Sequence, residues 1–201
     1  MKSKPALFSI ILLATVLISF KDKNEIKQCY ISFKSASGLV ATNPDRLPEG
    51  TEKYRTVSTA NGGVSVTRTD GYRILYNNDK KAPFVNLKVE LSEEKSYNLD
   101  KKKLLENLFF LASHTTGMES KNLIELKFNG YTVYGINRAT IETGNILGTF
   151  ILFPGNNTTI YFYFNNMELE YRNFTSLSDY KKQRDRFINE YTKYLNTCKG
   201  K

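Results

Sequence analysis

Apolar and polar residues alternate along several stretches of this chain, and this alternation predicts β-strands. The clearest stretch covers residues 84–91, where from Val85 onward every second residue is valine or leucine and the residues between them are polar. A period of two places the apolar side chains on one face of a strand, so we expect this strand to be half buried. Weaker strand patterns begin at Ile31, Tyr54, Val64 and Tyr72.

Turn and loop signals separate these strands. Residues 61–63 (Asn-Gly-Gly) and 70–71 (Asp-Gly) each predict a tight turn. Residues 41–51, which contain Pro44, Pro48 and Gly50, predict an irregular loop. This part of the chain therefore predicts a meander of antiparallel strands.

Two further hairpins are predicted in the second half of the chain. Residues 123–128 and 131–138 flank Asn129-Gly130, a pair typical of a type I′ turn, and residues 145–153 and 158–164 flank a turn at 154–157. The segment from Ile146 to Phe153 is largely apolar at both odd and even positions, which predicts a strand covered on both faces.

Apolar residues at helical spacing predict two helices. Asp100 is the predicted N-cap of the first, which we expect to end at Ser113, with Gly117 just beyond it. Ser176 and Asp179 form a capping box in front of the second helix, which should extend to about Asn196.

The order of strands, helix, four strands and helix predicts an α+β fold. A mainly antiparallel sheet with helices on both faces, an α/β/α sandwich, satisfies it. We expect residues 20–201 to form a single domain, because about 180 residues suffice to bury one core.

The first residues predict export. Lys2 and Lys4 precede an uncharged, mostly apolar run from Ala6 to Phe20, which is typical of a secretory signal peptide; cleavage after Ser19 would remove residues 1–19. A helix of this run spans ~22 Å, less than a hydrocarbon core of ~30 Å, so no stable transmembrane span is expected after processing. The alternatives are a buried core element or an uncleaved anchor. We expect a periplasmic or secreted protein.

The only two cysteines, Cys29 and Cys198, stand near opposite ends of the exported chain, 169 positions apart (198 minus 29). Because export exposes thiols to oxidising conditions, the pair is a candidate disulfide. A loop of this length would stabilise the fold by roughly 4–5 kcal/mol in the chain-entropy model. The alternative is two independent thiols.

The chain is basic, with a formal net charge of +9, or +7 once Lys2 and Lys4 are removed. Its lysines are dispersed and no nucleic-acid motif is present, so an envelope protein or an anionic envelope component is the expected partner rather than nucleic acid. A solvated basic surface is the alternative. The candidate basic binding residues are Lys181, Lys182, Arg184 and Arg186, expected largely on the outer side of the last helix.

Candidate chemistry is sparse. We expect no metal, since zinc needs about four ligands and the chain has one histidine, His114, and no cofactor, since no nucleotide-binding motif occurs. His114 as a general base is disfavoured, because it follows a helix and lacks a nucleophile elbow. Glu90, Glu93 and Glu94 are expected to lie at a solvated strand end.

Aromatic residues with polar tips are the remaining candidates, because tyrosines favour interfaces and carbohydrate-like ligands. Their alternative role is ordinary core beneath the last helix. The loop at residues 43–50 is a further candidate, with a plain connector as its alternative. The candidate tyrosines are Tyr131, Tyr134, Tyr161 and Tyr163.

The layout resembles that of the Mog1/PsbP-like α/β/α sandwich family, in particular small exported bacterial members of unknown function. The resemblance covers residues 31–199 and rests on the strand at 85–91, the Leu-Phe-rich helix from Asp100, the hairpin at 127–135, the strand at 149–153 and the closing helix. It implies a binding or assembly protein rather than an enzyme, with no shared catalytic constellation. The chain has no tryptophan, so the resemblance supports no photosystem role.

These observations together predict an exported, non-enzymatic binding or assembly module of the cell envelope. Two alternatives remain open at this point. One is a secreted hydrolase whose site is scattered in sequence, and the other is a small-molecule carrier with a tyrosine-lined pocket.

Overall fold

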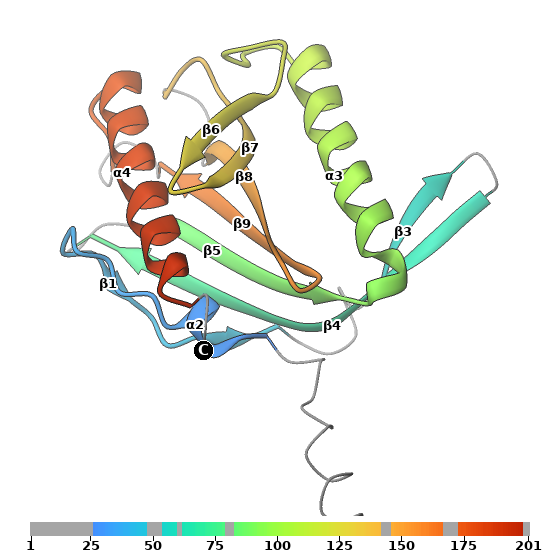
Figure 1. The fold of residues 1–201 in the computed structure, drawn as a ribbon. Coiled ribbons are helices and arrows are strands. Elements are labelled where there is room, and N and C mark those ends of the chain that lie inside the picture. The colour runs from blue at the N-terminus through green and yellow to red at the C-terminus, as the bar shows by residue number, and fades with distance from the viewer. Residues whose placement is uncertain are drawn as a thin grey trace, which may run out of the picture.

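The computed structural model describes residues 26–47, 54–59, 62–78, 83–141, 146–166 and 173–198. Within these residues an antiparallel sheet has the strand order β1-β4-β5-β9-β8-β7-β6, with β2 and β3 also paired to β4 (Figure 1). The strands are β1 (Val40–Ala41), β2 (Asp45–Arg46), β3 (Tyr54–Thr59), β4 (Gly62–Asn77), β5 (Pro83–Ser92), β6 (Ile124–Phe128), β7 (Tyr131–Asn137), β8 (Ile146–Gly155) and β9 (Thr158–Asn165). The helices are α2 (Gln28–Ile31), α3 (Glu94–His114) and α4 (Leu177–Asn196).

The two long helices cover opposite faces of the sheet. Along β9, Phe162 and Phe164 belong to the main core, which α4 covers, whereas Tyr161 belongs to a smaller cluster with Leu108 and Ala112 of α3. Neighbouring residues of a strand point to opposite faces, so these contacts place α4 and α3 on different sides. The predicted α+β class, an antiparallel sheet between helices, is confirmed.

The main core is rich in aromatic rings, and Phe187 of α4 lies at its centre. Its ring centroid is 5.0 Å from that of Tyr76 and 5.7 Å from that of Phe33, with the ring planes at 71° and 86°. Such edge-to-face pairs add ~0.5–1.5 kcal/mol beyond the burial of the rings. The N-terminal segment, β4 and α4 are thus joined through one side chain.

Both predicted hairpins are confirmed. Asn129 (φ 51°) and Gly130 (φ 82°) form the turn between β6 and β7, as a type I′ turn requires. The second turn is shorter than expected, because β8 and β9 extend toward each other and leave only Asn156 and Asn157, both with positive φ.

The last helix follows its capping signals closely. The Ser176 hydroxyl accepts a hydrogen bond from the Asp179 backbone N–H at 3.1 Å, and α4 ends at the predicted Asn196. Asp179 in turn accepts from the Thr175 backbone N–H at 3.1 Å. The predicted helix is therefore confirmed at both ends.

The start of α3 differs from the prediction. The helix begins at Glu94 with Glu93 as N-cap, and Asp100 lies inside it with only 1% of its surface exposed. Ser96, Asp100, Leu108 and Ala112 are spaced in multiples of four and form the buried stripe of the helix. Packing against the sheet thus overrides the capping preference of Asp100. Gly117, just past the helix, has the expected positive φ of 80°.

Two predictions in the N-terminal part are wrong. Ile31 ends the short helix α2 and does not begin a strand. Asp70-Gly71 is not a turn, because β4 runs without a break from Gly62 to Asn77, with a register shift between Arg68 and Asp70. A Cβ atom on Gly71 would lie 2.7 Å from Leu47 Cδ1, so close packing explains this glycine.

Several predicted features fall outside the described residues. These are the signal peptide at 1–19, the end of the predicted loop after Leu47, and Asn61 of the predicted turn at 61–63. Gly62 and Gly63 belong to β4 and not to the turn. The hairpin itself is present, with Thr59 paired to Gly62.

Substitution of Gly135 tests the tight contact between β7 and β8. Gly135 pairs with Phe150, and a Cβ atom there would collide with the Phe150 ring and lie 2.5 Å from the Thr149 carbonyl oxygen. We expect Gly135→Ala to lower the free energy of unfolding in urea by about 1–3 kcal/mol. Glu125→Ala, on the exposed side of β6, should change it by less than about 0.5 kcal/mol. Equal stability of the two variants would contradict this packing.

Candidate functional site

The largest exposed apolar side chains of α3 gather near its C-terminal end. Phe109, Phe110 and Leu111 are 49%, 59% and 43% exposed, and Ile146 at the start of β8 is 42% exposed. We call these four residues the α3 ridge. Residues 108–112 are five consecutive apolar positions, and a helix can turn only part of such a run toward its sheet. Leu108 and Ala112 take the buried positions, which leaves the others in solvent.

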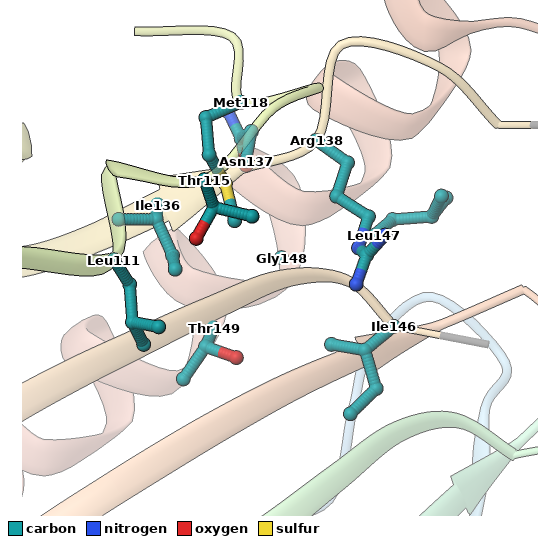
Figure 2. Close-up of a pocket in the computed structure, with 10 residues that line it drawn as sticks. All are labelled: Leu111, Thr115, Met118, Ile136, Asn137, Arg138, Ile146, Leu147, Gly148 and Thr149. Atoms are coloured by element: carbon teal, nitrogen blue, oxygen red, sulfur yellow. The ribbon is translucent and has the colours of Figure 1, made fainter. Parts of the chain in front are cut away.

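A cavity of about 230 Å³ lies beside this ridge, between the end of α3, the following turn and strands β7 and β8 (Figure 2). Leu111, Met118, Ile136 and Ile146 supply apolar side chains to it. The other lining residues are Thr115, Asn137, Arg138, Leu147, Gly148 and Thr149.

Arg138 is the charged residue of this lining. Its backbone N–H donates to the Leu147 carbonyl oxygen at 2.9 Å and it forms a β-bridge with Met118, so its backbone is fixed between two walls of the cavity. The side chain is exposed and has no hydrogen bond or ion pair with the described residues. In Figure 2 it extends from its strand toward Ile146.

The four candidate tyrosines do not form one surface. Tyr134 and Tyr161 share the α3 face, on either side of Ile151, and Tyr163 stacks on Tyr161 with centroids 6.0 Å apart. Tyr161 is only 4% exposed, and Tyr131 packs against the main core on the other face. Their alternative role as core therefore holds for Tyr161, although α3 rather than the last helix covers it. None of the four lines the described cavity.

The basic residues of α4 are also divided. Lys182 and Arg186 are exposed, whereas Lys181 pairs with Glu119. Arg184 is 4% exposed, so its expected place on the outer side of the helix is wrong.

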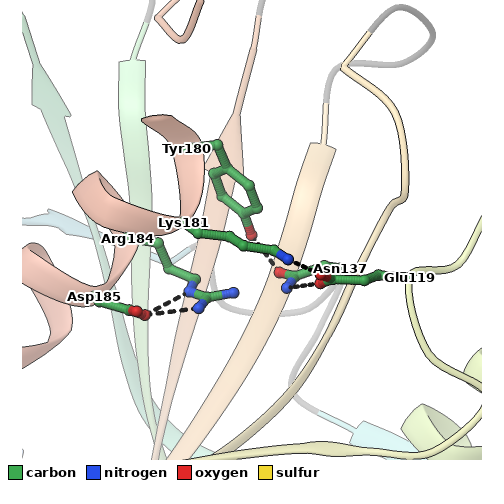
Figure 3. Close-up of polar contacts among 6 residues, drawn as sticks. All are labelled: Glu119, Asn137, Tyr180, Lys181, Arg184 and Asp185. Carbon is green, nitrogen blue, oxygen red and sulfur yellow. Dashed lines mark hydrogen bonds and ion pairs between the residues drawn. The ribbon is translucent and has the colours of Figure 1, made fainter. Parts of the chain in front are cut away.

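Arg184 is buried because aromatic rings and a carboxylate enclose its guanidinium. Its Nε and Nη2 lie 2.8 and 2.7 Å from Asp185 Oδ1 (Figure 3). Its Cζ lies 5.0 Å from the centroid of the Phe150 ring and 5.6 Å from that of Tyr180. Cation–π attraction and a charge-assisted pair thus offset the loss of hydration.

Asn137 links the same helix to the sheet and to the turn after α3. The Tyr180 hydroxyl donates to Asn137 Oδ1 at 2.6 Å, and Asn137 Nδ2 donates to Glu119 Oε2 at 2.6 Å (Figure 3). Burial raises the pKa of Tyr180, which keeps its hydroxyl a neutral donor. Glu119 is therefore engaged by both Asn137 and Lys181.

The two cysteines, far apart in sequence, are brought together. Cys198 is buried at the end of α4 and Cys29 lies in α2, both as thiols. Burial and a hydrogen bond with the Cys29 thiol raise the pKa of Cys198 to about 12. The Tyr191 hydroxyl donates to the Tyr30 carbonyl oxygen at 2.8 Å, which fixes the two helices beside each other. The proposed disulfide stays a prediction, with its two partners adjacent.

The carboxylate of Glu90 is not solvated as expected. It is 5% exposed and lies 2.9 Å from Lys88 Nζ and 3.8 Å from Arg68 Nη1. β5 lies between β4 and β9. Val85, Leu87 and Val89 are buried and the alternate Asn86 and Lys88 only partly, as predicted for a half-buried strand, whereas both faces are buried from Glu90 to Ser92. Glu93 and Glu94, at the start of α3, are exposed.

His114 makes local contacts at the end of α3. Its ring stacks on Phe110 with centroids 4.2 Å apart, and Nδ1 lies 2.7 Å from Ser113 Oγ and 3.0 Å from the Phe110 carbonyl oxygen. The Ser113 hydroxyl also lies 2.9 Å from the Phe109 carbonyl oxygen. These contacts of His114 and Ser113 with backbone carbonyl oxygens resemble those found at helix C-termini.

Of the loop at 43–50, the structure describes residues up to Leu47. Asp45 and Arg46 form β2, and Arg46 Nε lies 3.2 Å from Asp70 Oδ1. This part of the loop therefore runs along β4 as an additional short strand.

Within the described residues, no three His, Cys, Asp or Glu side chains are grouped so as to hold a metal ion. No described helix is both long and apolar enough to cross a membrane. No protein-family model, curated protein or solved structure matches the chain.

The cysteine pair yields a direct prediction. We expect the exported protein, without reductant, to have a mass two hydrogen atoms below that of its reduced form, with Cys29 and Cys198 resistant to alkylation. Cys29→Ser combined with Cys198→Ser should lower stability by up to roughly 4–5 kcal/mol relative to the oxidised protein. Two thiols that alkylate freely without denaturant would contradict the bridge.

Arg184 should contribute to stability far more than Arg186. Arg184→Ala removes the packing on two rings and leaves Asp185 unpaired, so we expect a loss of about 2–3 kcal/mol in urea unfolding. Arg184→Met should cost less, because Nη1 is buried without a hydrogen-bond partner among the described residues and an apolar chain avoids that cost. The exposed control Arg186→Ala should stay within about 0.5 kcal/mol of wild type. Similar losses at both positions would refute the buried site of Arg184.

Proposed function

We propose that this protein is an exported, non-enzymatic binding or assembly module that docks on an envelope protein through the α3 ridge. The observation that carries this proposal is the ridge itself, where two phenylalanines and a leucine, consecutive in α3, are each more than 40% exposed. Large apolar side chains left exposed at one end of a helix are a feature of interaction surfaces. Covering the exposed half of one such side chain is worth ~0.7–1.5 kcal/mol.

The basic face of α4 is a weaker candidate for the same role. Arg184 is buried and Lys181 is paired, so Lys182 and Arg186 are the exposed cations of the predicted set. Two solvated charges supply little binding free energy unless the partner removes them from water.

The proposal that the protein is exported is based on its first residues, in which Lys2 and Lys4 precede an apolar run. The net charge of +9, or +7 once Lys2 and Lys4 are removed, favours a partner whose surface is acidic around an apolar centre. An antiparallel sheet between two helices is also the layout expected of the Mog1/PsbP-like family. Membership in that family, and the binding role it implies, is part of this proposal.

Co-sedimentation with envelope fractions of the native host tests the ridge. We expect Phe109→Ser combined with Phe110→Ser to weaken envelope association at least tenfold, since two apolar anchors are lost. The matched control, Lys182→Ser combined with Arg186→Ser, should bind like wild type. Thermal unfolding verifies that both variants fold.

Two further experiments show whether the envelope partner is a protein or a lipid. Protease treatment of the envelope fraction should abolish binding, whereas vesicles of the extracted lipids should bind little protein. Undiminished binding of the ridge variant would disprove docking through the ridge. Binding lost only in the control would instead assign docking to α4.

A further inference from the structure

We propose that the cavity beside the α3 ridge binds a small amphiphilic carboxylate, with its apolar chain inside and its carboxylate on Arg138. The site is built from four segments that are separate in sequence: the end of α3, the turn through Met118, the end of β7 and the start of β8. The site shares Leu111 and Ile146 with the ridge, whereas Phe109 and Phe110 do not line it, so variants of these two phenylalanines test docking separately from the cavity.

The lining favours an apolar chain. Leu111 and Ile146 stand at the exposed side, and Ile136, which is 8% exposed, belongs to the cluster beneath α3 together with Met118. Apolar walls with a few polar groups are the usual composition of ligand sites. Transfer of methylene groups from water to such walls is favourable.

Arg138 favours an anionic head group. Its guanidinium presents a planar set of donors that matches a carboxylate, and it has no side-chain partner among the described residues. Glu119, the acidic residue on the turn after α3, is already engaged by Asn137 and Lys181. Because Arg138 is exposed, a bound carboxylate would keep part of its hydration.

The volume limits the ligand. Typical sites for drug-sized molecules measure ~300–1,000 Å³, and this cavity of about 230 Å³ is smaller. An alkyl chain of medium length fits this volume, whereas a large ligand of several fused rings does not. The ligand class is therefore a short or medium-chain alkyl carboxylate.

Calorimetric titration of the purified full chain tests this directly, with hexanoate, octanoate and decanoate as probes below their micelle concentrations. We expect affinity to rise about fourfold per added methylene until the cavity is full. Octanoate should bind at least tenfold more tightly than octylammonium, because the ammonium group meets Arg138. Absence of octanoate binding, or equal affinity for the two head groups, would overturn the proposal.

Variants test the contribution of Arg138 and that of the apolar cavity one at a time. Arg138→Gln should lower octanoate affinity about five- to tenfold and leave octanol affinity unchanged, whereas Arg186→Gln, the matched control, should change neither. Leu111→Trp, at the exposed side of the cavity, should weaken both ligands by filling the space.

A last comparison excludes adsorption on the ridge. Phe109→Ser combined with Phe110→Ser should leave octanoate binding intact while reducing envelope association. If that variant abolished octanoate binding and Leu111→Trp did not, the ligand would lie on the ridge and the cavity proposal would fail.

Discussion

The architecture depends on one constraint: the central strands β8 and β9 are apolar on both faces and need cover on both sides. Phe150, Phe162 and Phe164 require one cover and Ile151 and Tyr161 require another. Burying these side chains is the largest favourable contribution to folding, so two helices must pack on opposite faces of one sheet. α4 covers the larger, aromatic cluster, and α3 covers the smaller one.

The exposed ridge and the neighbouring cavity follow from how α3 meets its smaller cluster. The second cluster contains only a few buried residues, so α3 buries one narrow stripe and its apolar run at 108–112 exceeds what the sheet can cover. At the end of the helix the chain turns away through Met118 to pair with Arg138, which leaves the cavity between helix and strands (Figure 2). The exposed apolar side chains at this end of α3 are thus a consequence of incomplete cover.

Polar residues in the interior are retained where partners compensate for lost hydration. Arg184 lies between rings and Asp185, Glu90 lies beside Lys88 and Arg68, and Tyr180 donates to Asn137. Breaking such a buried pair costs more than its formation contributes. The contacts at the N-terminal segment follow the same rule, since Glu190 of α4 accepts hydrogen bonds from the Ser35 hydroxyl at 2.8 Å and the Ala36 backbone N–H at 3.1 Å.

The sequence by itself determined the elements whose signals are local. Asn129-Gly130 specified its turn because few residues adopt positive φ, Ser176 and Asp179 specified the start of α4 through their own hydrogen bonds, and two-sided apolarity identified β8 as central. Only the tertiary structure decided the rest. Asp100 became a buried helix residue, Arg184 left the surface to lie against Phe150, and the cysteines met across 169 positions, because packing between segments distant in sequence decides which side of each helix is buried. The cavity at Arg138 likewise forms only where four segments that are separate in sequence come together. The order of residues along the chain does not show which distant segments will be neighbours.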